Sequence, residues 1–123
     1  MIIAALKETF PGERRVALVP SVVAALKKKG IEAIIESGAG VAAGFPDEQY
    51  AAKGAKIVDS RADAFQQADV VVQVRMLGAN GPQGSGDLEL AKSGQVVLAM
   101  CDPLGSPESF RDAAAKEVSL FAL

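Results

Sequence analysis

The chain opens with an apolar run, Ile2-Ile3-Ala4-Ala5-Leu6, followed by the charged segment Lys7-Glu8-Thr9-Phe10-Pro11-Gly12-Glu13-Arg14-Arg15 and a second apolar run, Val16-Ala17-Leu18-Val19-Pro20. The first run has the length and composition of a buried strand. The charged segment, in which five of nine residues are ionisable, follows at the carboxyl end of that strand. Because ligands bind at this edge of open α/β sheets, the segment is interpreted as either a ligand-binding loop or a solvated turn.

Apolar segments suited to strands alternate along the chain with amphipathic segments suited to helices. The predicted strands are Ile2–Leu6, Ile31–Ser37, Lys56–Val58, Val70–Val74, Gln95–Met100 and Val118–Leu123. The predicted helices run from Ser21 to Gly30, from Pro46 to Gly54, onward from Ser60, over Leu88–Lys92, and from Pro107 to about Lys116. This alternation predicts an α/β fold of three layers, in which helices flank a mostly parallel sheet of five to six strands, Rossmann-like or flavodoxin-like.

Helix boundaries are indicated by capping residues. Ser21 is expected to cap the first helix and Gly30 to end it. Ser60, with Asp63 three residues later, resembles a capping box for the third helix. The segment Met76–Gly86 contains four glycines and one proline, which predicts a long and flexible loop.

Composition excludes several classes of protein. A length of 123 residues is that of one domain. The chain is 50% hydrophobic but only 5% aromatic, so its core is built from aliphatic residues, which suits a parallel sheet. The formal net charge of −2 gives no basic surface for a nucleic acid. No apolar run approaches the ~20 residues that span a bilayer, so no direct membrane insertion is predicted.

The chain contains a single cysteine, Cys101, and no histidine. An internal disulfide is therefore excluded, and so are most transition-metal sites, which need histidine or several cysteines. No metal site is predicted. The commonest general base at neutral pH is also missing, which excludes Ser-His-Asp and Cys-His mechanisms within this chain. Cys101 follows a predicted strand and is interpreted as a buried, unreactive thiol.

Three glycines follow the second predicted strand with the spacing G-x-G-x-x-x-G, at Gly38, Gly40 and Gly44. The dinucleotide-binding fingerprint is one residue shorter and follows the first strand, with an acidic residue about 20 positions further on at the end of a strong strand. The segment is therefore interpreted as a turn with positive φ angles. No cofactor-binding residue is predicted in this chain.

Several motifs occur in a characteristic order. They are Lys7-Glu8, then Glu13-x-Arg15-Val16-Ala17 with Pro20 before a helix, then Glu36-Ser37-Gly38-Ala39-Gly40, Ala52-Lys53-Gly54-Ala55, Ala68-Asp69-Val70-Val71 and Gly94-Gln95-Val96-Val97. Over essentially all 123 residues this order resembles the N-terminal part of alanine dehydrogenases and of the alpha subunit of proton-translocating NAD(P) transhydrogenase.

The resemblance assigns expectations to three residues, all at the predicted ligand edge. Arg15 matches the arginine that grips the keto-acid carboxylate in alanine dehydrogenases; the alternative is a structural ion pair with Glu8 or Glu13. Arg75 stands where those enzymes have a substrate-polarising lysine, and Asp102 where they have their catalytic histidine. An arginine cannot readily act as an acid or base, and an aspartate is a poor proton donor at neutral pH. Both changes argue against alanine dehydrogenase activity.

The resemblance therefore favours the transhydrogenase branch, in which a hydride passes between NADH and NADP⁺. It implies that residues 1–123 form one N-terminal domain of a longer subunit, inactive alone, with NAD(H) bound mainly by a downstream Rossmann domain. The expected partners are a second copy, a membrane beta subunit and an NADP(H)-binding component, on the cytoplasmic side and peripheral to the inner membrane. Arg15, Arg75 and Asp102 are then either remnants or residues of the cleft that faces the NAD(H) domain.

Two alternatives remain at this point. One is half of an enzyme resembling alanine dehydrogenase or saccharopine dehydrogenase, and the other is a non-catalytic α/β module for binding or assembly. The final segment, Val118–Leu123, is predicted as a buried strand. Because chains rarely stop inside a buried strand, the fold is expected to be incomplete at its C-terminus.

Overall fold

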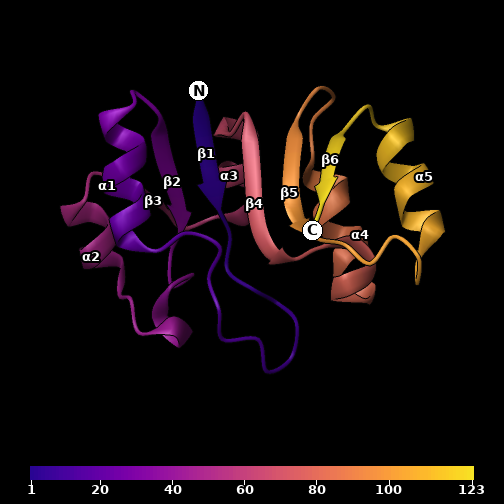
Figure 1. Cartoon of the computed structure of the whole chain (residues 1–123), viewed down its shortest axis with the longest axis horizontal. Coiled ribbons are helices and arrows are strands. Elements are labelled where there is room, and N and C mark those ends of the chain that lie inside the picture. The colour runs from indigo at the N-terminus through magenta and orange to yellow at the C-terminus, as the bar shows by residue number, and fades with distance from the viewer.

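A computed structural model describes all residues, 1–123, and places six strands in one sheet (Figure 1). The strands are β1 (Ile2–Ala5), β2 (Glu32–Glu36), β3 (Lys56–Val58), β4 (Val70–Arg75), β5 (Val96–Met100) and β6 (Ser119–Ala122). Their order is β3-β2-β1-β4-β5-β6, and every neighbouring pair is parallel. The predicted α/β architecture is confirmed. Of the two predicted types the order is the Rossmann one, with the direction of winding reversed between β1 and β4.

Five α-helices and two short 3₁₀ turns connect the strands. They are α1 (Pro20–Lys28), η1 (Val41–Ala43), α2 (Asp47–Ala52), α3 (Arg61–Gln67), η2 (Leu77–Asn80), α4 (Pro82–Leu90) and α5 (Pro107–Ala115). Helices α1 and α2 pack beside β2 and β3, while α3 packs against β1 and β2 with α4 beside it. Figure 1 shows α1 and α2 at one side of the molecule and α4 and α5 at the other.

Two apolar layers, one on each face of the sheet, form the core. The smaller layer joins α1 and α2 to the sheet through Val23, Tyr50, Ala5, Ile35 and Val72. The larger layer joins α3, α4 and α5 to the other face through residues that include Phe65, Leu88, Ala113, Val71 and Val97. Successive side chains of a strand point to opposite faces, so neighbours in one strand enter different layers. Fully burying a large aliphatic or aromatic side chain contributes about 1.5–3 kcal/mol.

The helix boundaries confirm two predictions and correct a third. The amide of Asp63 donates to Oγ of Ser60 at 3.2 Å, which confirms the cap of α3. Gly30 follows α1 with φ of +73°, as expected of a residue that ends a helix. The predicted cap at Ser21 is wrong, because α1 begins at Pro20. A proline suits the first helical position, where no amide hydrogen is needed and its fixed φ is already helical.

The glycine-rich segment Met76–Gly86 is not the predicted flexible loop, and the helix predicted over Leu88–Lys92 overlaps only the last residues of α4. The segment forms η2 and most of α4, which begins at Pro82 and ends at Leu90. A glycine is needed at position 84 because a Cβ there would collide with the backbone of Leu77. This close approach is a tertiary contact that residue propensities do not report.

The last strand corrects another prediction. β6 forms one edge of the sheet and pairs only with β5, so it is not a buried strand. Phe121 and Leu123 are 59% and 77% exposed. An apolar sequence therefore occupies an exposed edge position, which its hydrophobicity alone does not indicate.

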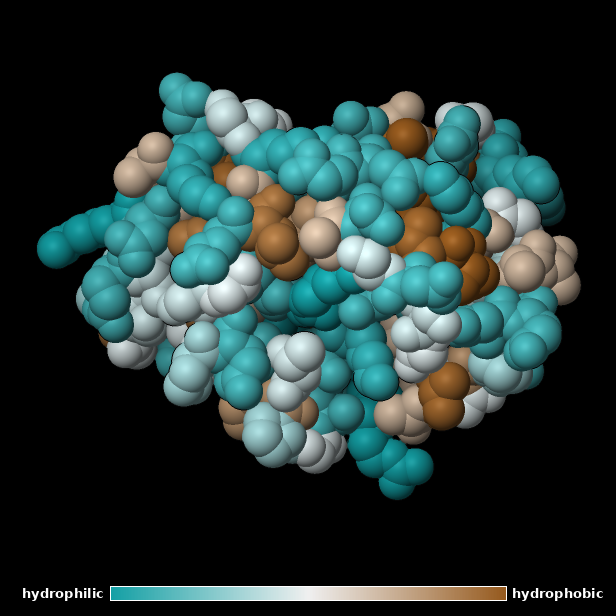
Figure 2. Space-filling model, turned by 180° about the vertical axis from the view of Figure 1, so that it is seen from behind, coloured by the Kyte–Doolittle hydropathy of each residue, from teal (hydrophilic) through white to brown (hydrophobic).

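The surface seen from behind is mostly polar, with apolar side chains in a few separate groups (Figure 2). Among the helices, none combines the length and the apolar character needed to cross a membrane.

Candidate functional site

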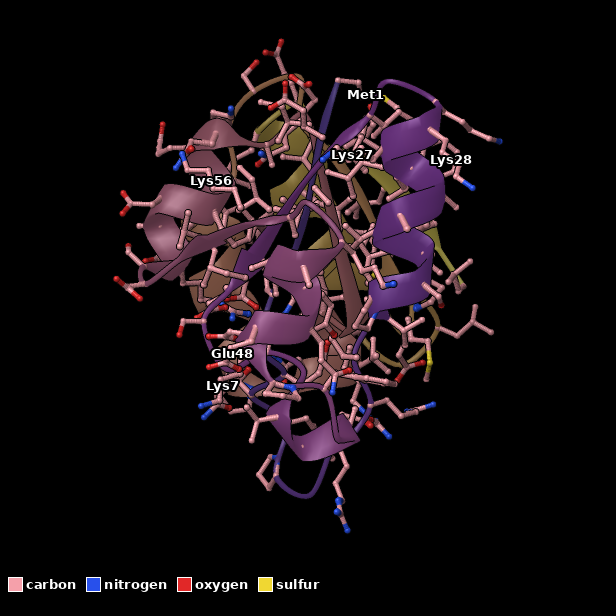
Figure 3. All side chains as sticks on the ribbon, turned by 90° about the vertical axis from the view of Figure 1, so that its left-hand side faces the viewer. Met1, Lys7, Lys27, Lys28, Glu48 and Lys56 are labelled. Atoms are coloured by element: carbon pink, nitrogen blue, oxygen red, sulfur yellow. The ribbon has the colours of Figure 1, made fainter.

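The candidate site lies at the edge of the sheet where the parallel strands end. The long connection between β1 and α1 hangs below this edge in Figure 1. In Figure 3 Lys7 lies toward this end of the molecule, whereas Met1 and Lys28 lie at the opposite end. A cleft of about 360 Å³ opens here, lined by Lys7, Glu8, Glu13, Arg15, Gly38, Ala39, Val41 and Ala42. The cleft lies between the segments that follow β1 and β2, on the carboxyl edge of the sheet where ligands bind but to one side of the β1–β4 reversal point.

Glu13 is the centre of the polar contacts in this cleft. Its carboxylate accepts two hydrogen bonds from the guanidinium of Arg15, at 2.8 and 2.7 Å, and one from Nε of Arg75, at 3.0 Å. The amides of Arg14 and Arg15 donate to the same carboxylate at 3.1 and 3.0 Å. The side chain of Glu13 is only 6% exposed, although that of Arg15 is 58% exposed. The ion pair that was the alternative for Arg15 is therefore present, with Glu13 as the partner.

Arg75 is held from several sides. Its guanidinium carbon lies 4.3 Å from the ring centroid of Phe10, a cation–π geometry. Its Nη1 donates to the carbonyl of Ala79 at 3.5 Å. We call Phe10, Glu13, Arg15 and Arg75 the open arginine cluster. It joins the β1–α1 connection to the end of β4, so the two predicted arginines are brought together by one carboxylate.

Glu8 fixes the backbone of β4 beside this cluster. Its carboxylate accepts hydrogen bonds from the amides of Val74 and Arg75, at 2.7 and 3.0 Å. These amides lie where the pairing of β4 with β5 is interrupted by a register shift. Glu8 therefore satisfies donors that the sheet leaves free, and this contact positions Arg75 through its own backbone.

The environments of the two glutamates move their pKa values in opposite directions. Hydrogen bonds from Arg15, helped by Arg75, hold the pKa of Glu13 far below its ordinary value. Burial raises the pKa of Glu8, although its two backbone hydrogen bonds partly oppose this effect. Ion pairing with Glu13 raises the pKa of the Arg15 guanidinium. Glu13 is therefore a carboxylate at neutral pH and is a poor general base.

A third arginine, Arg61, lies at the same edge and was not singled out by the sequence analysis. Nε and Nη2 of Arg61 donate to the two carboxylate oxygens of Asp87, and Nη1 donates to Glu36 at 2.8 Å and to the carbonyl of Lys7 at 2.9 Å. We call Arg61, Glu36 and Asp87 the buried arginine cluster, because their side chains are only 17%, 14% and 6% exposed. The position of Glu36 at the end of a predicted strand was the only sequence signal for it.

The third predicted residue, Asp102, stands apart from both arginines. It follows β5 with φ of +51°, and Oδ1 accepts a hydrogen bond from the amide of Gly105 at 3.2 Å. It makes no ion pair with Arg15 or Arg75 and does not line the cleft. The neighbouring Cys101 is fully buried, as predicted, and burial raises the pKa of its thiol to about 11.

The glycine turn after β2 and the acidic residue that ends this strand both make structural contacts, despite the Rossmann strand order. Gly38 and Gly44 have φ of +76° and +90°, which confirms the predicted turn. Gly40 serves packing, because a Cβ there would lie 2.6 Å from the Tyr50 hydroxyl. Glu36 ends β2, where an acidic residue would hold a ribose, but it is engaged by Arg61 and by the amide of Lys7 at 2.9 Å. No group of three or more His, Cys, Asp or Glu side chains is arranged to hold a metal ion.

Comparisons with known proteins agree with this architecture. The chain is 37% identical over 123 residues to NAD(P) transhydrogenase subunit alpha of Cereibacter sphaeroides, a match covering all of this chain and 22% of that protein. A transhydrogenase structure from Sinorhizobium meliloti superposes with a TM-score of 0.88 at 34% identity, over 99% of this chain and 34% of that chain. An L-alanine dehydrogenase structure gives a TM-score of 0.89 at 30% identity, over 99% of this chain and 32% of that chain.

The chain therefore spans between 22% and 34% of the length of these relatives. The sequence model of one family, described as alanine dehydrogenase/PNT, N-terminal domain, matches residues 4–123. The resemblance inferred from the sequence motifs is confirmed by this match. The chain belongs to the alanine dehydrogenase/PNT N-terminal domain family.

Proposed function

We propose that this chain is the N-terminal portion of the NAD(H)-binding alpha subunit of a proton-translocating NAD(P) transhydrogenase. Identity is 37% over the whole chain to an NAD(P) transhydrogenase subunit alpha but 30% over 119 residues to an alanine dehydrogenase, which supports this assignment. The observation that carries this assignment is that both arginines of the open arginine cluster already pair with an acid of the chain itself. Arg15 and Arg75 share the carboxylate of Glu13, so a substrate carboxylate would have to displace Glu13 to reach them.

The proposed reaction moves a hydride from NADH to NADP⁺ and needs no proton donor on this domain. Reduction of a keto acid, by contrast, requires a proton for the carbonyl oxygen. The chain has no histidine to supply it, and the carboxylate of Asp102 bonds to its own turn rather than facing the cleft. The available residues therefore suit a cleft wall better than a keto-acid site.

Because the glycine turn and Glu36 do not fit a dinucleotide, we place NAD(H) mainly on a second domain of the same subunit. The role of this domain is then to form one wall of a larger cleft between the two domains, with Lys7 and Arg15 among the residues available at this edge of the sheet. The corresponding assembly is a homodimer that associates with a membrane beta subunit and an NADP(H)-binding component, at the cytoplasmic face of the membrane.

The test measures both candidate reactions on the complete protein that contains this chain. A thionicotinamide analogue of NADP⁺ absorbs at a separate wavelength when reduced, so hydride transfer from NADH can be followed directly. We expect transfer to this analogue, and no NADH oxidation on addition of pyruvate and ammonium. NADH should not bind to the 123-residue chain alone.

The second candidate is an alanine-dehydrogenase-like enzyme, favoured by the position of Arg15 in the cleft wall and by the TM-score of 0.89 to an L-alanine dehydrogenase. Pyruvate-dependent NADH oxidation that disappears in Arg15→Ala would establish this candidate and refute the transhydrogenase assignment. Absence of both activities in the assembled protein would instead favour a binding or assembly module.

A further inference from the structure

Five of the eight lysines lie at the edge of the sheet where the parallel strands begin, opposite the candidate site. Three of them stand at the end of α1, and the other two flank the short turn between α2 and β3. We call this group the lysine face; its members, all exposed, are Lys27, Lys28, Lys29, Lys53 and Lys56. In Figure 3 Lys27, Lys28 and Lys56 lie toward the same end of the molecule as Met1.

A close contact between α1 and the turn before β3 joins the two groups of lysines. A Cβ placed on Gly54 would lie 2.5 Å from Nζ of Lys27, so the Lys27 side chain extends over the turn that carries Lys53 and Lys56. A hollow of about 230 Å³ at this place is lined in part by Lys27 and Gly54. The five lysines therefore form one continuous surface, although the two groups are far apart in the sequence.

The positive charge of the lysine face is not balanced within the chain. None of its five lysines forms an ion pair. Two acids lie at the same edge, Glu32 and Asp69, and Asp69 already lies 4.0 Å from the terminal amine of Met1. The C-terminal ends of α1 and α2 also lie here, and each offsets at most about half of one positive charge. The formal net charge of −2 for the whole chain conceals this asymmetry.

The composition of the lysine face favours an anionic lipid surface over a partner of fixed shape. The arginines all lie elsewhere in the chain, at Arg14, Arg15, Arg61, Arg75 and Arg111. Arginine recognises carboxylate and phosphate groups in a fixed geometry, whereas lysine is a point charge on a flexible stem. Residues 27–33 and 53–56 contain no aromatic side chain on which a nucleic-acid base could stack. A bilayer presents anionic headgroups that attract clustered lysines without a fixed geometry.

We propose that the lysine face binds anionic lipid headgroups and holds this domain against a membrane surface. The contact is electrostatic and requires no insertion into the bilayer. Because the candidate site lies at the opposite edge of the sheet, its cleft stays open while the lysine face is bound. The proposal does not depend on the hydride transfer proposed above. The thionicotinamide assay tests that reaction, whereas vesicle binding tests this surface, so either can fail alone.

The experiment measures co-sedimentation of the 123-residue chain with vesicles of equal parts phosphatidylglycerol and phosphatidylcholine, and with vesicles of phosphatidylcholine alone. We expect binding to the anionic vesicles only, weakening as salt is raised, because salt screens exposed charges. The triple variant Lys27→Gln/Lys28→Gln/Lys29→Gln should bind about tenfold more weakly or worse, because each lysine near an anionic surface contributes about fivefold to binding. Lys53→Gln/Lys56→Gln should also weaken binding, since both groups belong to one surface.

The matched control is Lys7→Gln/Arg14→Gln/Arg111→Gln, which removes three positive charges from exposed side chains outside the lysine face. It should bind anionic vesicles like the unsubstituted chain, and circular dichroism should show that every variant remains folded. The proposal is overturned if the unsubstituted chain does not bind anionic vesicles at low ionic strength, or if the control loses as much binding as the lysine variants. Duplex DNA that binds as tightly as the vesicles, through the same lysines, would also overturn it in favour of a nucleic-acid surface.

Discussion

Two arginine clusters lie at the same edge of the sheet and use the same chemistry in different surroundings. The buried cluster joins Arg61 to Glu36 and Asp87, and the Arg61 side chain is 17% exposed. The open cluster joins Arg15 and Arg75 to Glu13, and the Arg15 side chain is 58% exposed. Both attach the β1–α1 connection to the sheet, the first through the carbonyl of Lys7 and the second through Glu13.

The two clusters differ in how many hydrogen-bond donors of each guanidinium are already used. Arg61 donates to two carboxylates and one carbonyl, each from a different part of the chain. Burial acts to lower the pKa of Arg61, but pairing with Asp87 and Glu36 outweighs it and raises the pKa. Arg15 uses only one carboxylate, and the rest of its side chain faces solvent. The buried arginine cluster therefore stabilises the fold, whereas the open one leaves most of the Arg15 side chain in contact with solvent.

The largest expected effect comes from breaking the buried cluster. Arg61→Ala leaves Glu36 and Asp87 as poorly solvated, unpaired charges, and we expect a loss of about 3 kcal/mol or more in the free energy of unfolding. Urea denaturation followed by circular dichroism measures this loss. Arg111→Ala, on the exposed face of α5, is the matched control and should remain close to the unsubstituted chain. Equal stability of the two variants would remove the distinction between the clusters.

A smaller loss of stability is expected for Glu13→Gln, and the size of this loss should depend on pH. The pKa of Glu13 in the folded state lies below its ordinary value of 4.5, so its stabilising contribution is present above pH 4.5 and is lost as the pH falls below it. The stability difference between the unsubstituted chain and Glu13→Gln should therefore shrink on acidification.

Denaturation midpoints measured over a series of pH values test this expectation. Glu89→Gln, an exposed residue of α4 without an ion pair, separates the loss of the Glu13 contact from the loss of one negative charge. A difference that stays constant across the acid range would show that the Glu13 ion pair does not stabilise the folded chain.

The smallest effect on stability is expected for Arg15→Ala. Exposed ion pairs contribute little, because water screens them and long side chains lose freedom on pairing. Arg75 also continues to pair with Glu13 after this substitution. The denaturation midpoint should therefore change far less than in Arg61→Ala. A comparable loss of stability in the two variants would show that the open cluster stabilises the fold as much as the buried one does.

Sequence patterns predicted the open cluster in part and missed the buried one. Arg15 and Arg75 follow or end predicted strands, and the rule that parallel strands end at one edge brings them together. Arg61 and Asp87 lie in helices, where no spacing relates them to Glu36. Their contact exists because α3 and α4 pack side by side on one face of the sheet, which is a property of the folded chain.

The absence of tertiary contacts from sequence patterns also explains the errors in the predicted secondary structure. Gly81 and Gly84 indicated a loop, yet Gly81 provides the φ of +57° that starts α4, and Gly84 allows α4 to pack on Leu77. A glycine has the same local signature whether it loosens a loop or allows a close contact. The edge position of β6 was hidden for a similar reason, since apolar alternation does not record which strand is outermost.

Periodicity, caps and the order of short motifs were enough to determine the α/β class, the parallel sheet, most element positions and the family. These features are local, or follow from the restricted ways in which βαβ units connect. Tertiary structure alone decided that one carboxylate, Glu13, serves both arginines, that Asp102 turns away from them, and that Arg61 closes the same edge. Such pairings depend on side chains far apart in the chain meeting in a shared environment, where burial sets the strength of each charge.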